Sequence, residues 1–279
     1  MQIAENKMGD FSVYPTTDDL PPYLQRYVSY DSACKMFFFR HPLMVTMLPL
    51  VSPLPIEEFL KDKAKWVRSA LIDDKNPHRY LHRHERAFRS TAFLRLLSDG
   101  YWDDAHTNSK RACEFWQCAA YVWADCEEDE GSDIWQAILE AEIPHREFMT
   151  SSADRRALRE MGDYITVYRG VQGSNSEEAF EEGILGYQWT LDRKTAVFFS
   201  QRFLRAPDRG FILKTQVRTS EAIAYLTSRG ESEIIFSPDN LYRDDIEITH
   251  VTEMAAGRAK IERKRMFADN LTQALNVNC

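Results

Sequence analysis

Short runs in which apolar and polar residues alternate fill the chain from Tyr164 onward, and turn residues separate them. Such runs, rich in β-branched and aromatic residues, are typical of strands with one buried face. They are YITVYRG, GYQWTL, GFILKTQV, AIAYL, SEIIF and DIEITHV, with one helical run, DRKTAVFFSQRF, among them. The pattern therefore predicts an α+β carboxy-terminal half.

The chain between Pro55 and about residue 160 has instead a helical period of apolar positions. The clearest runs are PIEEFLKDKAKWVRSALI, HRYLHRHERAFRSTAFLRLL and a long segment from about Asp103 to Cys126. Two shorter runs, DIWQAILEAE and ADRRALREM, follow the acidic stretch CEEDEGSD, which indicates a solvated connector. We therefore expect a helical domain over residues 55–160.

The two ends of the chain differ from both patterns. In residues 1–54, prolines interrupt aromatic and aliphatic clusters, so this segment is predicted to be irregular and to pack against another part of the protein. The final stretch, GRAKIERKRMFADNLTQAL, predicts a basic amphipathic helix within residues 254–279. The α+β part between them is expected over residues 161–253.

The composition favours a folded, acidic protein. Of the 279 residues 44% are hydrophobic, which is enough for one large domain or two ordinary ones, and the net charge is -8. An acidic balance argues against the broadly basic surface of non-specific nucleic-acid binders. The five cysteines form no CxxC pair and no regular spacing, which fits reduced thiols better than disulfides or a zinc site.

We expect the protein to be soluble and cytoplasmic, without membrane association. Its amino terminus, MQIAENKMGD, contains acidic residues and no apolar stretch of the kind found in secretory signals. The most apolar run, from Met36 to Leu50, contains Arg40 and two prolines and is too short to span a bilayer.

Three short stretches of the second half contain candidate chemistry. Glu231 and Glu233 are two apart at the head of an apolar run, where a strand would place both carboxylates on one face. Arg169 lies near the end of the run YITVYRG, and Gln188-Trp189-Thr190 precede a helical run. Taken singly, these features are typical of a solvated strand edge, a surface arginine and a packed strand end.

Taken in order, the three stretches resemble the motif blocks of the arginine-type mono-ADP-ribosyltransferases, the R-S-E class. The blocks are an aromatic residue and arginine on a strand, here Tyr168-Arg169-Gly170, a strand running into a helix, here GYQWTLDRKTAVFFSQRF, and Glu-x-Glu after a turn, here Gly230 to Phe236. The resemblance covers about residues 163–252. It implies a split β-sandwich ADP-ribosyltransferase domain that uses NAD as its substrate and needs no metal.

The chemistry of NAD explains why these residue types are needed. Cleavage of the ribose–nicotinamide bond requires stabilisation of an oxocarbenium-like ribose cation, but no acid for the leaving group, which is already a cationic pyridinium. By resemblance, Glu233 is the catalytic carboxylate that stabilises this cation, and Arg169 anchors the pyrophosphate through bidentate donors. Glu231 then orients or deprotonates the nucleophile, which would explain why two neighbouring carboxylates are tolerated.

The second block departs from the Ser-Thr-Ser pattern of the family. Gln188, Trp189 and Thr190 occupy these positions, so Gln188 stands where the family has the serine that steadies the catalytic glutamate. The amide of Gln188 can donate the same hydrogen bond, and in a shifted alignment Thr190 supplies the hydroxyl. The implied cofactor-binding set contains these three residues, Arg169, Tyr168, Gly170 and an aromatic residue of the following helix, Phe199 or Phe198.

The turn before Glu231 is expected to contact the macromolecular target. In the family the corresponding loop helps to select the target, and here Tyr225 and Arg229 offer stacking and pairing with acid or phosphate. A glutamate at position 231 favours a protein arginine in this class, but members that modify nucleic acid are known. The expected target is therefore a protein or RNA.

The helical half contains two further candidates. His78 and His82 are four apart and could bracket a metal, but no third ligand is evident, so a solvated cationic face is the better interpretation. Basic residues nearby form either a strip for RNA or an acidic partner, or an ordinary charged surface. They are Lys61, Lys63, Lys65, Arg68, Arg79, Arg83 and Arg86.

The resemblance also implies a biological setting. The family is widely represented among phage effectors, secreted toxins and toxin–antitoxin modules, so the expected role is an intracellular toxin or phage-related effector. Residues 1–54 are then a candidate docking surface for an antitoxin or chaperone. The alternatives are an NAD glycohydrolase on the same scaffold, with water as the acceptor, and a degenerate ADP-ribosyltransferase fold retained as a binding module.

Overall fold

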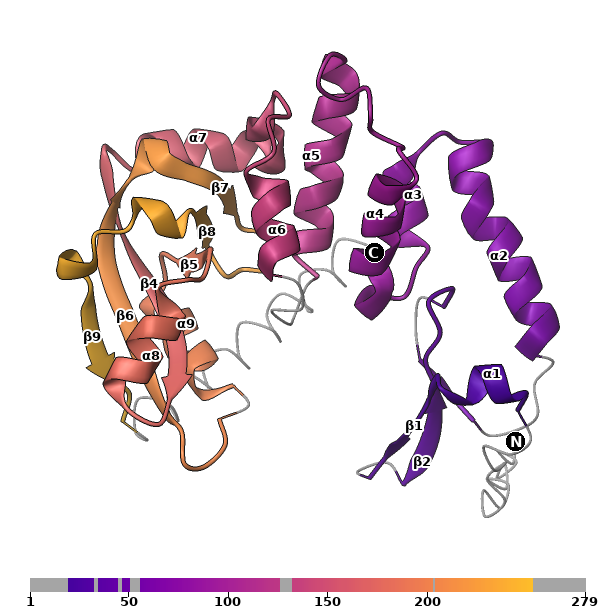
Figure 1. Ribbon diagram of the computed structural model, residues 1–279, viewed down its shortest axis with the longest axis horizontal. Helices are drawn as coiled ribbons and strands as arrows, with labels where there is room; N and C mark the ends of the chain where they lie inside the picture. The colour runs from indigo at the N-terminus through magenta and orange to yellow at the C-terminus, as the bar shows by residue number, and fades with distance from the viewer. Residues whose placement is uncertain are drawn as a thin grey trace, which may run out of the picture. The chain divides into compact units, whose positions relative to one another are not determined.

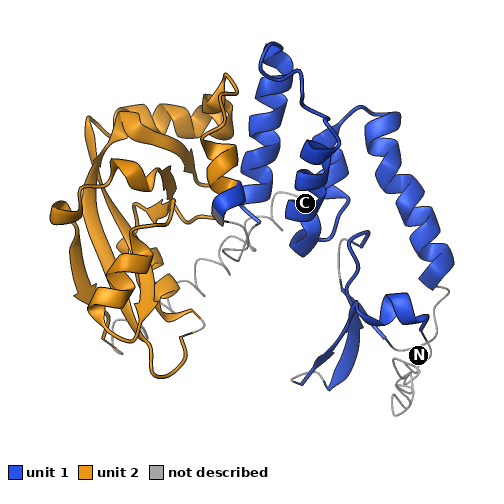
Figure 2. Cartoon of the chain, viewed as in Figure 1, with its two compact units in different colours: residues 1–134 blue, residues 135–279 orange. Residues whose placement is uncertain are grey.

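The computed structural model describes residues 20–32, 35–44, 47–50, 56–125, 132–202 and 204–252. Within this part the protein combines helices with antiparallel sheets, which confirms the predicted α+β class. The chain divides into two compact units, residues 1–134 and 135–279, which Figure 2 shows in different colours. The helix predicted within residues 254–279 and the acidic connector at 126–131 lie outside the described residues.

The first unit contains a small sheet in the region for which the sequence predicts irregular structure. A short helix, α1 (Pro22–Gln25), precedes three antiparallel strands in the order β1-β2-β3. The strands are β1 (Val28–Asp31), β2 (Met36–Phe39) and β3 (Leu48–Pro49). Leu24 and Phe39 are buried in a cluster that also contains Leu60 of the next helix. The prediction that residues 1–54 are irregular is therefore wrong for these strands. Strands this short show no period in the sequence.

A helical region completes the first unit. Its helices are α2 (Ile56–Ile72), α3 (Pro77–His82), α4 (Arg89–Ser98) and α5 (Ser109–Trp123). Asn76 and Asn108 cap α3 and α5, since the side-chain oxygen of each accepts the backbone N–H three residues further on. None of the described helices of the protein combines the length and apolar character needed to cross a bilayer.

The helix predicted over residues 78–97 is interrupted between α3 and α4 by a short 3-10 turn, η2 (Arg86–Phe88). Glu85, directly before this turn, is buried, and its backbone N–H bonds to the carbonyl of Pro42 at 3.0 Å. Its carboxylate accepts the N–H of Ala87 and pairs with Arg40 at 3.0 Å. These bonds stabilise the break and tie it to the loop after β2.

Helices α6 (Ser132–Leu139) and α7 (Ser152–Glu160) precede the large sheet, with a 3-10 turn, η3 (Arg146–Met149), between them. Helix α7 belongs to the second unit, because its residues Ala157 and Leu158 pack against the apolar cluster of the large sheet. The boundary expected at residue 160 therefore lies at residue 134. Periodicity could not place it, because α7 has the same period as the helices before it.

A six-stranded antiparallel sheet of order β7-β8-β5-β4-β6-β9 forms the centre of the second unit (Figure 1). Its strands are β4 (Tyr164–Gly173), β5 (Gln188–Thr190), β6 (Arg209–Arg218), β7 (Ala222–Leu226), β8 (Glu233–Phe236) and β9 (Glu247–His250). Each run predicted as a strand overlaps one of them: β7 coincides with its run, AIAYL, whereas β4 and β6 extend beyond theirs. Short 3-10 turns, η4 (Thr219–Glu221), η5 (Pro238–Asn240) and η6 (Arg243–Asp245), lie between strands.

Helices cover both faces of this sheet. On one face lies α8 (Ser176–Gly183), so close to β4 that a Cβ added to Gly173 would be 3.0 Å from that of Ala179. On the other face lies α9 (Arg193–Gln201), where a Cβ added to Gly170 would be 2.0 Å from the carbonyl oxygen of Ala196. Alternation along β4 places Gly170 and Gly173 on opposite faces, in agreement with these contacts.

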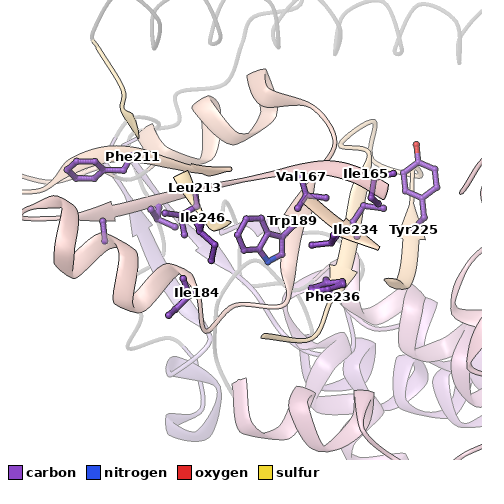
Figure 3. Packing of buried hydrophobic residues seen from close by; sticks show 13 residues of the cluster. Ile165, Val167, Ile184, Trp189, Phe211, Leu213, Tyr225, Ile234, Phe236 and Ile246 are labelled. Carbon is purple, nitrogen blue, oxygen red and sulfur yellow. The ribbon is translucent and has the colours of Figure 1, made fainter. Parts of the chain in front are cut away.

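The main apolar core lies on the α8 face of the sheet. Trp189 is 2% exposed and lies among Val167, Leu213 and Ile234 (Figure 3). A smaller cluster beneath α9 contains Ala196, Val197 and Ile212. The two clusters hold α8 and α9 against the strands that carry the motif stretches.

Candidate functional site

The three motif stretches lie on neighbouring strands. β5 pairs with β4 on one side and with β8 on the other, so the second stretch lies between the first and the third. The register places Tyr168 opposite Thr190, and Thr190 opposite Glu233. Because directly paired residues point to the same face, these three side chains form a row across the sheet, called the cross-strand row below.

The cross-strand row lies where two parts of the sheet meet. Between β4 and β5 the register contains one pair, Tyr168 with Thr190, whereas β4 and β6 share ten pairs from Tyr164–Arg218 to Gly173–Arg209. A single pair therefore joins the strands β7-β8-β5 to the strands β4-β6-β9.

Arg169 points to the opposite face from the row and braces the start of β5. Alternation along β4 places it on the face of Val167, away from Tyr168. Its Nη1 donates a 2.6 Å hydrogen bond to the carbonyl of Gln188. The guanidinium lies against Gly186, where an added Cβ would be 2.0 Å from Nη2. Gly186 therefore makes room for the arginine. The sequence indicates this role only by a glycine at the start of a run predicted as a strand.

Thr190 supplies a hydroxyl that organises the third stretch. Its Oγ1 donates a 2.5 Å hydrogen bond to the carbonyl of Glu231 and accepts a 3.0 Å bond from the N–H of Asp192. Gln188, in contrast, is exposed and lies opposite Ile235. Of Gln188 and Thr190, the two residues predicted to steady Glu233, Thr190 is the one that lies opposite Glu233 in the register.

The start of β5 is also held by Tyr187. Burial and the 2.9 Å hydrogen bond that its hydroxyl donates to Glu140 raise the pKa of Tyr187 to about 12. Its carbonyl accepts a 2.9 Å bond from the N–H of Phe236 in β8. The segment that carries Gly186 and Gln188 is therefore fixed by bonds from two sides.

The two glutamates do not share a strand. β8 begins at Glu233, and Glu231 lies in the preceding turn, where Gly230 and Ser232 have positive φ angles of 69° and 47°. The expectation that one strand presents both carboxylates on one face is therefore wrong, because the left-handed turn breaks the alternation. Glu231 is only 7% exposed, whereas Glu233 is half-buried. The turn thus gives the two carboxylates different environments.

Trp189 and Tyr225 are core residues, 2% and 7% exposed, and both belong to the cluster in Figure 3. The indole N–H of Trp189 donates a 3.1 Å bond to the carbonyl of Gly186. The backbone N–H of Tyr225 bonds to Oγ1 of Thr150 at 3.1 Å. The predicted contacts of Trp189 with the cofactor and of Tyr225 with the target are corrected, because both rings are packed in the interior.

Tyr168, Gly170 and Phe199 lie on the side of α9. Tyr168 is half-buried and packs against the cluster beneath this helix. The absence of a side chain at Gly170 allows α9 to approach β4 closely. The half-buried rings of Phe198 and Phe199 contact each other edge to face, with 5.4 Å between centroids. Either ring has surface to offer a ligand, and the contact with nicotinamide stays a prediction.

Arg229 lies in the turn between β7 and β8 and is half-buried. The turn is closed by a 2.8 Å bond from the N–H of Gly230 to the carbonyl of Thr227. The hydroxyl of Thr227 donates a 2.7 Å bond to Asp154 of α7. These bonds fix the position of the turn, and the contact of Arg229 with a target stays a prediction.

His78 and His82 both contact Tyr121. Nδ1 of His82 is 2.9 Å from the hydroxyl oxygen of Tyr121, and the ring centroid of His78 is 4.4 Å from that of Tyr121. Burial, together with the nearby charges of His82 and Arg89, lowers the pKa of His78. Across the described ranges, no group of three or more His, Cys, Asp or Glu side chains is placed to hold a metal ion.

Arg79, Arg83 and Arg86 are engaged in ion pairs. Arg79 and Arg83 pair with Asp74 at 2.8 and 3.5 Å, and Arg86 pairs with Asp125 at 2.9 Å. Arg83 is also buried. These arginines therefore stabilise the helical region itself, and a basic strip there would consist of the lysines of α2 with Arg68.

The site places a half-buried carboxylate, a fixed hydroxyl and a guanidinium around the short strand β5. The carboxylate of Glu233 can stabilise a positive charge that develops close to it. The guanidinium of Arg169 can pair with a phosphate through several N–H donors. A ligand with an anionic end and a reacting centre that becomes cationic therefore matches the chemistry of these residues.

Comparison of the chain with models of protein families, with curated proteins and with solved structures gave no significant match. The functional assignment therefore depends on the residues of this chain and their geometry.

Proposed function

We propose that the protein is a mono-ADP-ribosyltransferase, which cleaves NAD at the ribose–nicotinamide bond and transfers ADP-ribose to a macromolecular target. One observation carries the proposal: stretches far apart in the sequence meet on β4, β5 and β8, with Thr190 directly between Tyr168 and Glu233. A shared reaction gives a physical reason for this adjacency. The split ADP-ribosyltransferase architecture is part of the proposal, and it is supported by the single pair that joins β5 to β4.

Glu233 is the catalytic carboxylate in this proposal. Half-burial lowers the effective dielectric around it, which strengthens its attraction to the ribose cation of the transition state. Glu231 orients the nucleophile of the target. Because Glu231 is 7% exposed, this role requires the turn at Gly230 to move when the target binds.

Arg169 is the proposed anchor for the pyrophosphate. A guanidinium has five N–H donors, so the bond from Nη1 to the carbonyl of Gln188 is compatible with pairing to a phosphate. Arg169 and the cross-strand row point to opposite faces of the sheet, so NAD in this arrangement has to pass around one end of the three-residue strand β5 to reach Glu233. Thr190 positions the carboxylate by holding the turn before it.

A second candidate function is a binding module on a degenerate scaffold. The observation that favours it is the brace between Arg169 and the start of β5, since this contact gives the arginine a structural purpose without NAD. The exposed Gln188 in place of the family serine points in the same direction. Failure of the full chain to bind NAD in calorimetry would decide for this candidate.

The cellular role that we attach to the transferase is that of a toxin or phage-related effector acting inside the cell. Expression of the wild-type chain should then arrest growth of a bacterial host, because stray ADP-ribosylation is harmful. Expression of Glu233→Gln at an equal level should not. Arrest by both proteins would mean that toxicity does not depend on the carboxylate.

The transferase is tested with NAD labelled in its adenine ring, cell lysate, and either wild-type protein or Glu233→Gln. The substitution is nearly isosteric, so it should keep the fold and abolish labelling of macromolecules. Protease and ribonuclease treatment of separate samples identify the target as protein or RNA. Free labelled ADP-ribose without labelled macromolecule would instead indicate an NAD glycohydrolase, and equal labelling by both proteins would refute the role of Glu233.

A further inference from the structure

A hollow of about 520 Å³ lies at the other end of β4 from the motif site. It is formed where α7 ends and where the first residue of β4, Tyr164, pairs with the last residue of β6, Arg218. Tyr164 and Arg169 are five residues apart on the same strand, which corresponds to about 17 Å. The hollow is therefore a separate site from the residues assigned to NAD.

The floor of the hollow is held by two hydrogen bonds between the start of β4 and the end of β6. Thr219 donates its backbone N–H to the carbonyl of Asp163 at 2.9 Å. Its hydroxyl donates to the carbonyl of Gly162 at 2.6 Å, and Gly162 turns the chain with a φ of 85°. The shape of the hollow is thus set by backbone contacts before any ligand arrives.

Two guanidinium groups line this hollow without an ion-pair partner among the described residues. Arg159, in the last turn of α7, and Arg218, at the end of β6, are both exposed. Several other arginines are neutralised by acids, as Arg83 is by Asp74 and Arg243 by Glu181. Two exposed, unneutralised cations at one hollow favour an anionic ligand.

The hollow also offers an aromatic ring and polar groups. Tyr164 is 57% exposed, and the guanidinium carbon of Arg218 lies 6.0 Å from its ring centroid. An exposed ring beside a guanidinium stacks well with a flat heterocycle. Asp163 and Ser220 line the same space and can bond to ribose hydroxyls or to an exocyclic amine. Its volume is typical of pockets for small molecules.

We infer that this hollow binds a nucleoside phosphate, with the phosphate at Arg159 and Arg218 and the base on Tyr164. A phosphate alone would not use the ring, and an apolar ligand would leave the two guanidinium groups unpaired. The nucleotide is either a free molecule or one unit of a single-stranded RNA. The site goes beyond the transferase assignment and does not depend on it.

The test measures binding of AMP and of a short single-stranded oligoadenylate to the full chain by calorimetry, with adenosine and inorganic phosphate as reference ligands. Arg218→Gln and Tyr164→Leu change exposed side chains, so both variants should fold. Arg209→Gln is the matched control, because Arg209 is an exposed arginine at the opposite end of β6. We expect each hollow variant to weaken AMP binding at least about tenfold and the control to bind like wild type.

The two sources of the nucleotide give different results. If the oligoadenylate binds more tightly than AMP and responds to the same variants, the occupant is RNA; equal affinities identify a free nucleotide. The inference is overturned if wild type binds neither ligand, or if inorganic phosphate binds as well as AMP. It is also overturned if AMP binding responds to Gly186→Ala but not to Arg218→Gln, since the nucleotide would then lie beside β5.

Discussion

Gly186 determines where the guanidinium of Arg169 lies. A methyl group at this position would be 2.0 Å from Nη2 and 2.1 Å from Cζ, so Gly186→Ala must displace the guanidinium. Because the end of a flexible side chain can move, we expect a stability loss of about 1 kcal/mol, the lower end of the usual cost of an added methyl group. NAD affinity should fall at least about tenfold, because a charge-assisted contact is lost.

Calorimetry with NAD measures this effect. Leu185→Ala is the matched control, since Leu185 is the neighbouring residue and is 70% exposed. The same NAD affinity for both variants would show that Arg169 is a structural brace and not an anchor.

Thr190 connects the second motif stretch to the third. Thr190→Val keeps the shape of the side chain but leaves the carbonyl of Glu231 and the N–H of Asp192 without their bonds in a buried place. We expect a loss of about 1–3 kcal/mol in the free energy of unfolding, measured by urea denaturation. Release of nicotinamide from NAD should also fall, since the turn before Glu233 is no longer held.

Thr190→Ser is the control for this prediction, because serine keeps the hydroxyl that makes both bonds. Its nicotinamide release should stay close to that of wild type. A valine variant that is as stable and as active as the serine variant would mean that the two bonds do not position Glu233.

The motif residues could be found from the sequence, but not their environments. The order of Arg169, Thr190 and Glu233 along the chain is visible, whereas the pairing of Thr190 with Glu233 is a matter of register. Register also decides which side chains of β5 and β7 enter the core. Because the sequence does not show the register, it does not reveal that Trp189 and Tyr225 are core residues and not ligand contacts. The left-handed Ser232 has no sequence signal, since serine rarely adopts this conformation.

Helix α9 is held close to β4 by Gly170. An added Cβ would be 2.0 Å from the carbonyl oxygen of Ala196 and 2.6 Å from the backbone nitrogen of Ser200. These are backbone atoms, so Gly170→Ala must shift the whole helix, at a cost of about 1–3 kcal/mol. Thermal denaturation should show a melting temperature lower by about 3 °C for each kcal/mol.

Thr166→Ala, on the same face of β4, is the control for a general effect of substitution on this strand. It should lower the melting temperature less than Gly170→Ala does. If both variants melt like wild type, α9 is not packed on β4 as closely as the structure indicates.

Elements with a clear period were predictable, and short or polar ones were not. Alternation identified β4 and β6, and a helical period identified α2 and α9. The pattern does not predict α8, because SEEAFEEG has few apolar residues. Its available signal is Asn175, whose side chain accepts the N–H groups of two following residues and caps the helix. The sequence does not predict the small sheet of the first unit, because its strands are too short to show an alternating pattern.

The protein as a whole should lose stability in mild acid. Burial and the charge of Arg26 lower the pKa of His41 from 6.5 to about 4, and burial also lowers the pKa values of His78 and His84. Below pH 6.5 the unfolded chain binds protons at these positions that the folded chain does not bind. The free energy of unfolding is therefore unaffected by these groups above pH 6.5 and falls as the pH drops toward 4.

Urea denaturation between pH 7.5 and pH 4.5 measures this dependence. His41→Asn removes one titrating group and keeps an acceptor for the N–H of Leu43, so its stability should fall less steeply with pH. All other titrating groups are the same in the wild type and in the variant. The same slope for both proteins would contradict the depressed pKa of His41.

Release of nicotinamide from NAD tests the central claim most directly, because it does not require the target to be known. Wild-type protein should release nicotinamide, and Glu233→Gln should do so at least about a hundredfold more slowly, as expected when one group that stabilises the transition state is lost. Circular dichroism should show the same fold for both. Equal rates, or no release by wild type at any NAD concentration, would contradict the assignment of β4, β5 and β8 as an NAD-cleaving site.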